Sequence, residues 1–195
     1  MSDEVTVIDL LPHCSSTPRG EWAGANDERP LSEKGLREAE VLAAVAAEGV
    51  RGVYTSSALR CRQSVGPLAA AAGVPVTVDE RLREGFDEPA DWVGGVFAPI
   101  GQALGGAWTA ARGVAVLGEV AARHRGGRAV VCSHGDLIPV VLAHLASTHS
   151  CSPPTIVDRG GWFRLTFASD GLSMVGLHPS RMTDPSCGAY DSGDE

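Results

Sequence analysis

Two apolar runs of this chain end at a histidine. VTVIDLL (residues 5–11) is followed by Pro12 and His13, and RAVVCS (128–133) is followed by His134. Short runs rich in β-branched apolar residues are typical of buried strands. A lone histidine at a strand end commonly only completes a core, but an imidazole can also serve as a nucleophile, a proton donor or a metal ligand. Two such histidines therefore raise the hypothesis of one shared site.

An arginine and a carboxylate follow two further predicted strands. RGVYTSS (51–57) precedes Arg60 at the start of a helical segment, and VPVTVDERL (74–82) precedes Glu84. An arginine is unfavourable at the positive end of a helix unless an anion lies there. In parallel sheets the carboxyl ends of the strands share one edge, where ligands bind. The pattern therefore predicts that both histidines, the arginine and the carboxylate converge there.

Helical patterns alternate with these strands. Ser32 is a predicted N-cap, and a final hairpin with a turn near Asp170–Gly171 is expected at the sheet edge. The predicted helices cover residues 33–50, 58–73, 107–124 and 137–147, and the hairpin strands cover 160–169 and 172–179. This alternation predicts an α/β fold, a three-layer sandwich whose mainly parallel central sheet is flanked by helices.

We expect a single domain over residues 1–182, with a small cap insertion over the Gly- and Pro-rich residues 85–105. The acidic residues 183–195 are expected to form a disordered tail. The net charge of -8 argues against binding to nucleic acid or to a membrane surface. The start MSDEVTV does not resemble a signal peptide, and five cysteines without a CxxC pair suggest free thiols in the cytoplasm.

Four motifs resemble, in order, those of the histidine phosphatase (phosphoglycerate mutase-like) superfamily. LLPHCSST resembles its RHG segment in a degraded form, and SSALRCRQSV is similar to its S-x-x-x-R-A-x-Q-T segment. RLRE resembles the segment that supplies its acid, and VVCSHGDLI its second-histidine motif. RPLSEKG is like the RPLTxxG of the small bacterial branch. The resemblance extends over about residues 5–145.

The resemblance implies a phosphatase that needs no metal or cofactor and hydrolyses a small phosphomonoester through a phosphohistidine. His13 would attack phosphorus, Arg60 would bind the phosphoryl oxygens, and His134 would donate to the same oxygens. Glu84 would protonate the leaving oxygen, provided that burial raises its pKa. Three neighbouring carboxylates compete for that last role: Glu80, Asp87 and Glu88.

The chain departs from the motif on both sides of the predicted nucleophile. Pro12 replaces an arginine and Cys14 replaces a glycine, so a guanidinium is lost and space is reduced near the phosphoryl group. Arg19, in the same loop, is predicted to replace part of the lost charge, and Ser16 is a further predicted phosphate ligand.

Two alternatives remain open at this stage. The change at Pro12 could have ended catalysis, leaving a pseudophosphatase that binds a ligand or a partner protein. Alternatively, Cys14 and Cys132 could form a metal or thiol site with His13 and His134. The sequence does not predict the oligomeric state.

Overall fold

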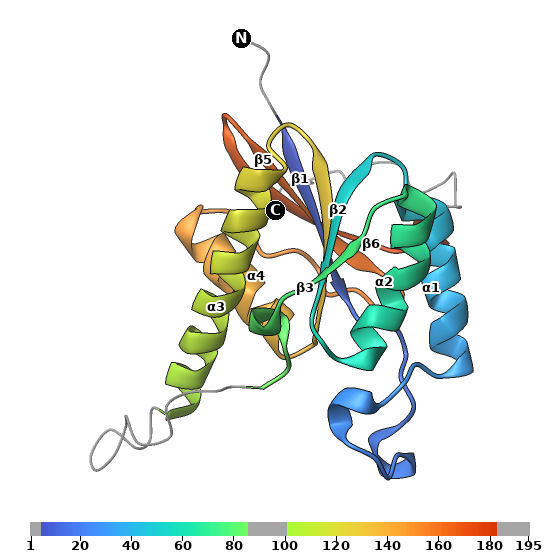
Figure 1. The fold of residues 1–195 in the computed structure, drawn as a ribbon. Coiled ribbons are helices and arrows are strands. Elements are labelled where there is room, and N and C mark those ends of the chain that lie inside the picture. Colours follow the sequence, from blue (N-terminus) through green and yellow to red (C-terminus); the bar gives the residue numbers. More distant parts are fainter. Residues whose placement is uncertain (1–4, 86–100, 183–195) are drawn as a thin grey trace.

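The computed structural model describes residues 5–85 and 101–182, which form a six-stranded sheet with helices on both faces. The strand order is β3-β2-β4-β1-β5-β6 (Figure 1). The strands are β1 (Thr6–Pro12), β2 (Val50–Thr55), β3 (Val76–Val78), β4 (Arg128–Ser133), β5 (Trp162–Ala168) and β6 (Gly171–Leu177). The first four strands are parallel to one another, β5 is antiparallel to β1, and β5 and β6 form an antiparallel hairpin at the edge. The prediction of a mainly parallel sheet is confirmed.

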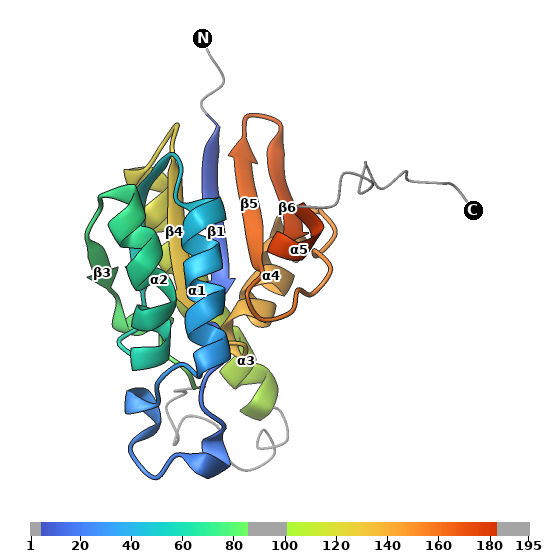
Figure 2. The same ribbon diagram turned by 90° about the vertical axis from the view of Figure 1, so that its right-hand side faces the viewer.

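Two helices cover each face of the sheet, and this confirms the predicted three layers. Figure 2 shows α1 and α2 in front of the sheet, while α3 and α4 lie behind it. The helices are α1 (Glu33–Ala46), α2 (Leu59–Ala72), α3 (Gly101–Arg123), α4 (Leu137–Thr148) and the short α5 (Pro179–Met182). Each face carries its own apolar core, so neighbouring residues of β1 face different cores: Leu10 packs with α3 and α4, and Leu11 with α1 and α2. This alternation is the period of a strand buried on both sides.

A buried ion-pair network joins the three central strands. Asp9 of β1 is fully buried and accepts hydrogen bonds from Arg128 of β4 and from Arg164 of β5. The Arg164 Nε–Asp9 Oδ1 distance is 2.8 Å. A buried carboxylate is stable only when it is paired in this way. The network fixes β1 against both neighbours, four residues before His13.

Several elements differ in extent from their predictions, and the helix predicted over residues 33–50 ends at Ala46. The strand predicted over 74–82 is short, because the Asp79 side chain accepts a hydrogen bond from the Arg81 backbone N–H at 2.9 Å and starts a 3-10 turn over Glu80–Leu82. Such local side-chain bonding competes with the sheet ladder. The third long helix begins at Gly101 rather than at residue 107. Most of the proposed cap, residues 86–100, and the proposed tail lie outside the described residues.

The four described cysteines are free, as predicted: Cys14, Cys61, Cys132 and Cys151. No helix in the described ranges is long and apolar enough to cross a membrane.

Candidate active site

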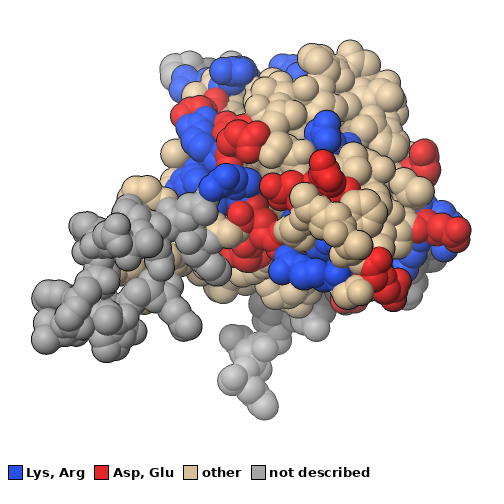
Figure 3. Space-filling view, turned by 60° about the horizontal axis from the view of Figure 1, so that its bottom comes forward, with Lys and Arg blue, Asp and Glu red and all other residues tan. Residues whose placement is uncertain are grey.

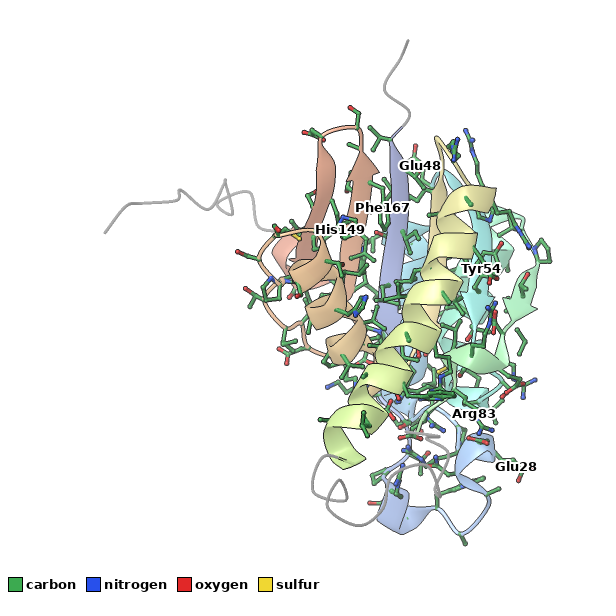
Figure 4. All side chains as sticks on the ribbon, turned by 90° about the vertical axis from the view of Figure 1, so that its left-hand side faces the viewer. Glu28, Glu48, Tyr54, Arg83, His149 and Phe167 are labelled. Carbon is green, nitrogen blue, oxygen red and sulfur yellow. The ribbon has the colours of Figure 1, made fainter. Side chains whose placement is uncertain are left out.

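The carboxyl ends of the strands bring the predicted site residues to one end of the molecule. Figure 4 shows Arg83, the neighbour of Glu84, at the same end as Glu28, and Glu48 and Phe167 at the opposite end. The rings of His13 and His134 meet edge to face, with centroids 5.5 Å apart. The two histidine motifs therefore share one site, as their positions after β1 and β4 predict.

His13 is held in one protonation state by its surroundings. Its Nδ1–H donates to the Cys14 carbonyl oxygen at 2.8 Å, since a carbonyl can only accept. Burial, and after it the positive charge of Arg159, lower the pKa of His13 from 6.5 to about 3. The side chain is 5% exposed. His13 is therefore neutral at pH 7, with its lone pair on Nε2, the form that a nucleophile requires.

Arg60 is the charged residue of the site that is completely buried. Its side chain is fully buried, with Nη1 donating to the Asn26 carbonyl at 2.7 Å and Nη2 donating to Glu84 Oε2 at 2.5 Å. Its Nε has no hydrogen-bond partner. A buried N–H on a guanidinium costs free energy unless it is satisfied. One N–H of this buried guanidinium is thus left without an acceptor.

His134 is fixed through both ring nitrogens. Arg60 Nη2 donates to His134 Nδ1 at 3.3 Å, so the proton of the neutral ring lies on Nε2, which donates to Ser56 Oγ at 2.9 Å. Ser56 itself is completely buried at the end of β2. Its role in orienting His134 was not predicted, although SSALRCRQSV begins with this serine.

Glu84 closes the site from the segment after β3. Besides Arg60, its carboxylate accepts hydrogen bonds from Asn26 Nδ2 at 2.7 Å and from Arg19 Nη2 at 3.1 Å. Burial raises the pKa of Glu84, but the Asn26 hydrogen bond and the charges of Arg60, His134 and Arg19 outweigh it, so that the pKa lies below 4.5. The condition that burial raises the pKa is therefore not met, and Glu84 is ionised at neutral pH. Of its predicted rivals, Glu80 binds Ser57 and the other two lie outside the described residues.

The loop after His13 is held by a buried arginine that sequence reasoning missed. Arg29 Nη1 donates to Ser16 Oγ at 2.6 Å and to the Thr17 carbonyl at 2.7 Å. Because the Ser16 hydroxyl accepts this bond, its own proton remains available to an anion. Arg19 is 69% exposed and pairs with Glu84. The signal for Arg29 was its place at the start of RPLSEKG.

Pro12 is tolerated in the central strand β1 because the pairing of β1 with β5 ends before this residue. The pairing of β1 with β5 extends only to Leu10, whereas the next backbone N–H, that of His13, donates to the Ser133 carbonyl of β4 at 2.9 Å. Pro12 thus lacks an N–H where no ladder partner requires one. A second missed arginine lies here, since Arg159 Nη1 donates to the His13 carbonyl at 2.6 Å.

The thiol alternative is not favoured by the environment of Cys14. Burial raises the pKa of this thiol to about 11, so the reactive thiolate is absent near pH 7. Within residues 5–85 and 101–182, no group of three or more His, Cys, Asp or Glu is arranged to hold a metal ion. Cys61 and Cys132 lie in the core between the sheet and helices α1 and α2, as predicted for core thiols.

The described surface around this end of the molecule carries both signs of charge. On the face that Figure 3 brings forward, basic and acidic side chains are interspersed rather than separated. The concentration of positive charge is instead internal, where Arg60 is fully buried and Arg29 is 8% exposed. Enclosed guanidinium groups of this kind suit a small anion more than an extended one.

Comparison with known proteins agrees with this geometry. Residues 10–178 match the family model of the histidine phosphatase superfamily (branch 1). An 8-oxo-(d)GTP phosphatase of Mycolicibacterium smegmatis is 27% identical over 170 residues, which cover 87% of this chain and 46% of that protein. The chain thus spans about half the length of this curated relative.

Solved structures show the same fold. A mycobacterial glucosyl-3-phosphoglycerate phosphatase matches with a TM-score of 0.59 and 25% identity over 83% of this chain and 90% of that one. A phosphoglycerate mutase from Bacillus anthracis matches with a TM-score of 0.66 and 16% identity over 91% of this chain and 95% of that one.

Proposed function

Because the chain belongs to the histidine phosphatase superfamily (branch 1), we propose that it hydrolyses a small phosphomonoester, without a metal, through a phosphohistidine on His13. The observation that carries this proposal is the neutral His13, its Nδ1–H bound to the backbone, beside a fully buried Arg60 with a vacant N–H. The 8-oxo-(d)GTP and glucosyl-3-phosphoglycerate phosphatases among its relatives support a phosphorylated metabolite as the substrate class.

In the first step His13 Nε2 attacks phosphorus. A nitrogen–phosphorus bond forms, the ester phosphorus–oxygen bond breaks, and the leaving oxygen takes a proton from Glu84. The Cys14 carbonyl stabilises the positive imidazole through Nδ1–H. Arg60 neutralises the charge on the phosphoryl oxygens in the transition state.

Binding of the substrate raises the pKa of Glu84, so that the carboxylate takes up the required proton. Its carboxylate accepts a hydrogen bond from Arg60 Nη2 at 2.5 Å. A bound phosphoryl dianion would take over that donor and place negative charge beside the carboxylate, and both effects raise the pKa of Glu84. Protonation is thereby linked to substrate binding.

In the second step a water molecule attacks phosphorus and the nitrogen–phosphorus bond breaks. Glu84, now ionised, accepts the proton of the water, so that inorganic phosphate leaves and His13 is regenerated. His134 is proposed to donate to the phosphoryl oxygens, which requires a proton on Nδ1. That proton can bind once Arg60 turns from His134 to the phosphoryl group.

The test is hydrolysis of an aryl phosphate in the presence of a metal chelator, comparing the wild type with His13→Ala and with His144→Ala. His144 is exposed on α4 and serves as the matched control. We expect activity in the wild type and in the control, none above background in His13→Ala, and an acid-labile, alkali-stable phosphoprotein that depends on His13.

Equal activity in wild type and His13→Ala would overturn the proposal. No activity in any of them would favour the pseudophosphatase, for which the observation is Pro12 in place of a guanidinium. Pro12→Arg then separates the two explanations, because a gain of hydrolysis would show that only one charged group was missing.

A further inference from the structure

An open space lies against Pro12, the residue before the predicted nucleophile. A cavity of about 250 Å³ lies against Pro12, between α4 and the segment that leads into β5. Its wall includes Gly135, Ile138 and Phe163, together with Arg159. Arg159, from elsewhere in the chain, therefore lines the cavity that lies against position 12.

Arg159 bridges the two histidine motifs. Its Nη1 donates to the His13 carbonyl at 2.6 Å. Its Nη2 lies 3.8 Å from the position that a Cβ on Gly135 would occupy, next to His134. Among the charged groups that lower the pKa of His13, Arg159 has the largest effect, ahead of Arg60. The guanidinium is thus near the imidazole that would attack phosphorus.

The backbone around Arg159 is fixed by a tight turn. The Gly161 N–H donates to the Asp158 carbonyl at 3.0 Å, and Gly160 has a φ of +87°, which favours glycine. His178 Nε2–H donates to the Arg159 carbonyl at 3.3 Å. These contacts fix the backbone of Arg159, although the residue itself is exposed to solvent.

Most of the hydrogen-bonding capacity of Arg159 is unused. Across residues 5–85 and 101–182, no carboxylate lies within ion-pair distance of it, and only Nη1 has a protein acceptor. By contrast, Arg19, the residue predicted to replace the missing charge, is paired with Glu84. A guanidinium that keeps donors available next to His13 is suited to bind a phosphoryl oxygen.

We propose that Arg159 replaces the arginine absent at position 12 and binds an oxygen of the phosphoryl group transferred to His13. This inference rests on the proposed function for its catalytic part, but it predicts phosphate binding in its own right. The replacement comes from the segment between α4 and β5 and not from the loop that carries Arg19.

The binding test uses inorganic phosphate and isothermal titration of the wild type, Arg159→Ala, Arg159→Lys and Arg62→Ala. Arg62 is exposed on α2 and matches the charge change without facing the site. We expect Arg159→Ala to weaken phosphate about 10–100-fold, the loss of one charge-assisted contact. Arg159→Lys should lose less, and Arg62→Ala should change affinity less than about twofold.

The value of kcat/KM distinguishes binding of the phosphoryl group by Arg159 from a merely structural role. Arg159→Ala should lower kcat/KM for an aryl phosphate at least as much as it weakens phosphate binding, because charge increases in the transition state. Pro12→Arg should restore much of that loss in the Arg159→Ala background and add less to the wild type. If Pro12→Arg does not fold, Arg159→Lys still separates charge from fork geometry.

The outcomes distinguish the inference from the proposed function. Unchanged phosphate affinity and kcat/KM in Arg159→Ala would overturn the inference even if His13→Ala is inactive. Phosphate binding that depends on Arg159, without hydrolysis that depends on His13, would support the inference and overturn the proposed function. A wild type that neither binds phosphate nor hydrolyses the ester would overturn both.

Discussion

At the scale of single residues, the site is built from side chains whose hydrogen bonds fix where protons lie. His13 has its proton on the nitrogen that faces the backbone, and His134 has its proton on the nitrogen that faces Ser56. Both assignments follow from partners that can only accept or only donate. In the proposed mechanism, His13 is therefore ready to attack without a separate base, and Glu84 supplies the proton for the leaving group.

The role of Glu84 predicts an effect that depends on the leaving group. In Glu84→Gln, kcat/KM for an alkyl phosphate should fall about 10²–10⁴-fold, because an alkoxide needs a proton to leave. For p-nitrophenyl phosphate the loss should be much smaller, since that phenolate leaves unprotonated. Steady-state kinetics with both esters measure the difference, and kcat/KM includes steps only up to ester cleavage.

Glu80→Gln is the matched control, because Glu80 is four residues away and binds Ser57 instead of Arg60. An equal loss for both esters in Glu84→Gln would contradict the acid role. Since the pKa of Glu84 lies below 4.5 in the free protein, kcat/KM for the alkyl ester should also rise as the pH falls from neutral.

Arg19 gives a second prediction at this scale. If its guanidinium assists the phosphoryl group, as the sequence predicts, Arg19→Ala should lower kcat/KM about tenfold. Its observed partner is Glu84 in an exposed ion pair, which by itself contributes little. A loss no greater than that in Arg62→Ala would remove Arg19 from the site.

Residues next to predicted strand ends could be found from the sequence, and others could not. His13, Arg60, Glu84 and His134 all follow strands whose apolar runs are readable, so their convergence follows from parallel topology. Arg159 is 146 residues from the histidine whose carbonyl it contacts, in a segment without periodicity. Nothing local in the sequence indicates that contact, since it depends on how the β5 hairpin packs.

At the scale of elements, the start of α1 positions the loop that carries His13. Ser32 caps this helix by accepting from the Gly35 N–H at 3.2 Å, and its own N–H donates to the Ser15 carbonyl at 3.0 Å. A Cβ on Gly35 would lie 1.9 Å from that carbonyl oxygen. The glycine therefore permits the close approach of helix and loop.

Gly35→Ala should destabilise the protein by about 1–3 kcal/mol and lower its activity, because the loop must move away from the helix. Gly118→Ala is the control, since Gly118 is exposed within α3 and a Cβ there meets nothing within 4 Å. That change should stabilise by about 0.5–1 kcal/mol and leave activity unchanged. Chemical denaturation and aryl phosphate assays measure both effects, and a harmless Gly35→Ala would refute the packing argument.

The bounds of the strands and helices were predictable where a local sequence pattern defines them. β4 has the predicted bounds, and α4 begins at Leu137 as predicted, because apolar periodicity and the flanking Gly and Asp residues define them. β3 was overestimated, because VPVTVDERL continues to look like a strand after Asp79 has started a turn. Its three residues are exposed, so burial does not extend the strand.

At the scale of the whole molecule, the buried neutral His13 links stability to pH. The unfolded chain binds a proton on this imidazole near pH 6.5, whereas the folded protein does so only near pH 3. The unfolded state therefore binds more protons between these values, and the contribution of His13 is complete above pH 6.5 and is lost as the pH falls towards 3.

Between pH 6.5 and 5 this difference amounts to about 1–2 kcal/mol of unfolding free energy. His13→Gln should lose that much less stability than the wild type over the same interval, measured by urea denaturation at each pH. His144→Gln, an exposed control, should behave as the wild type. Parallel losses in wild type and His13→Gln would show that His13 titrates normally.

The contact between Glu84 and Arg60 makes the carboxylate an intramolecular competitor for the site. A tethered group of this kind acts at a high effective concentration, so every free anion must displace it before reaching the guanidinium. This competition would reduce the affinity for released phosphate, and the competing group is the one that we propose as the proton donor. Product inhibition by inorganic phosphate would therefore be weak. Glu84→Gln should bind inorganic phosphate more tightly and hydrolyse alkyl esters more slowly.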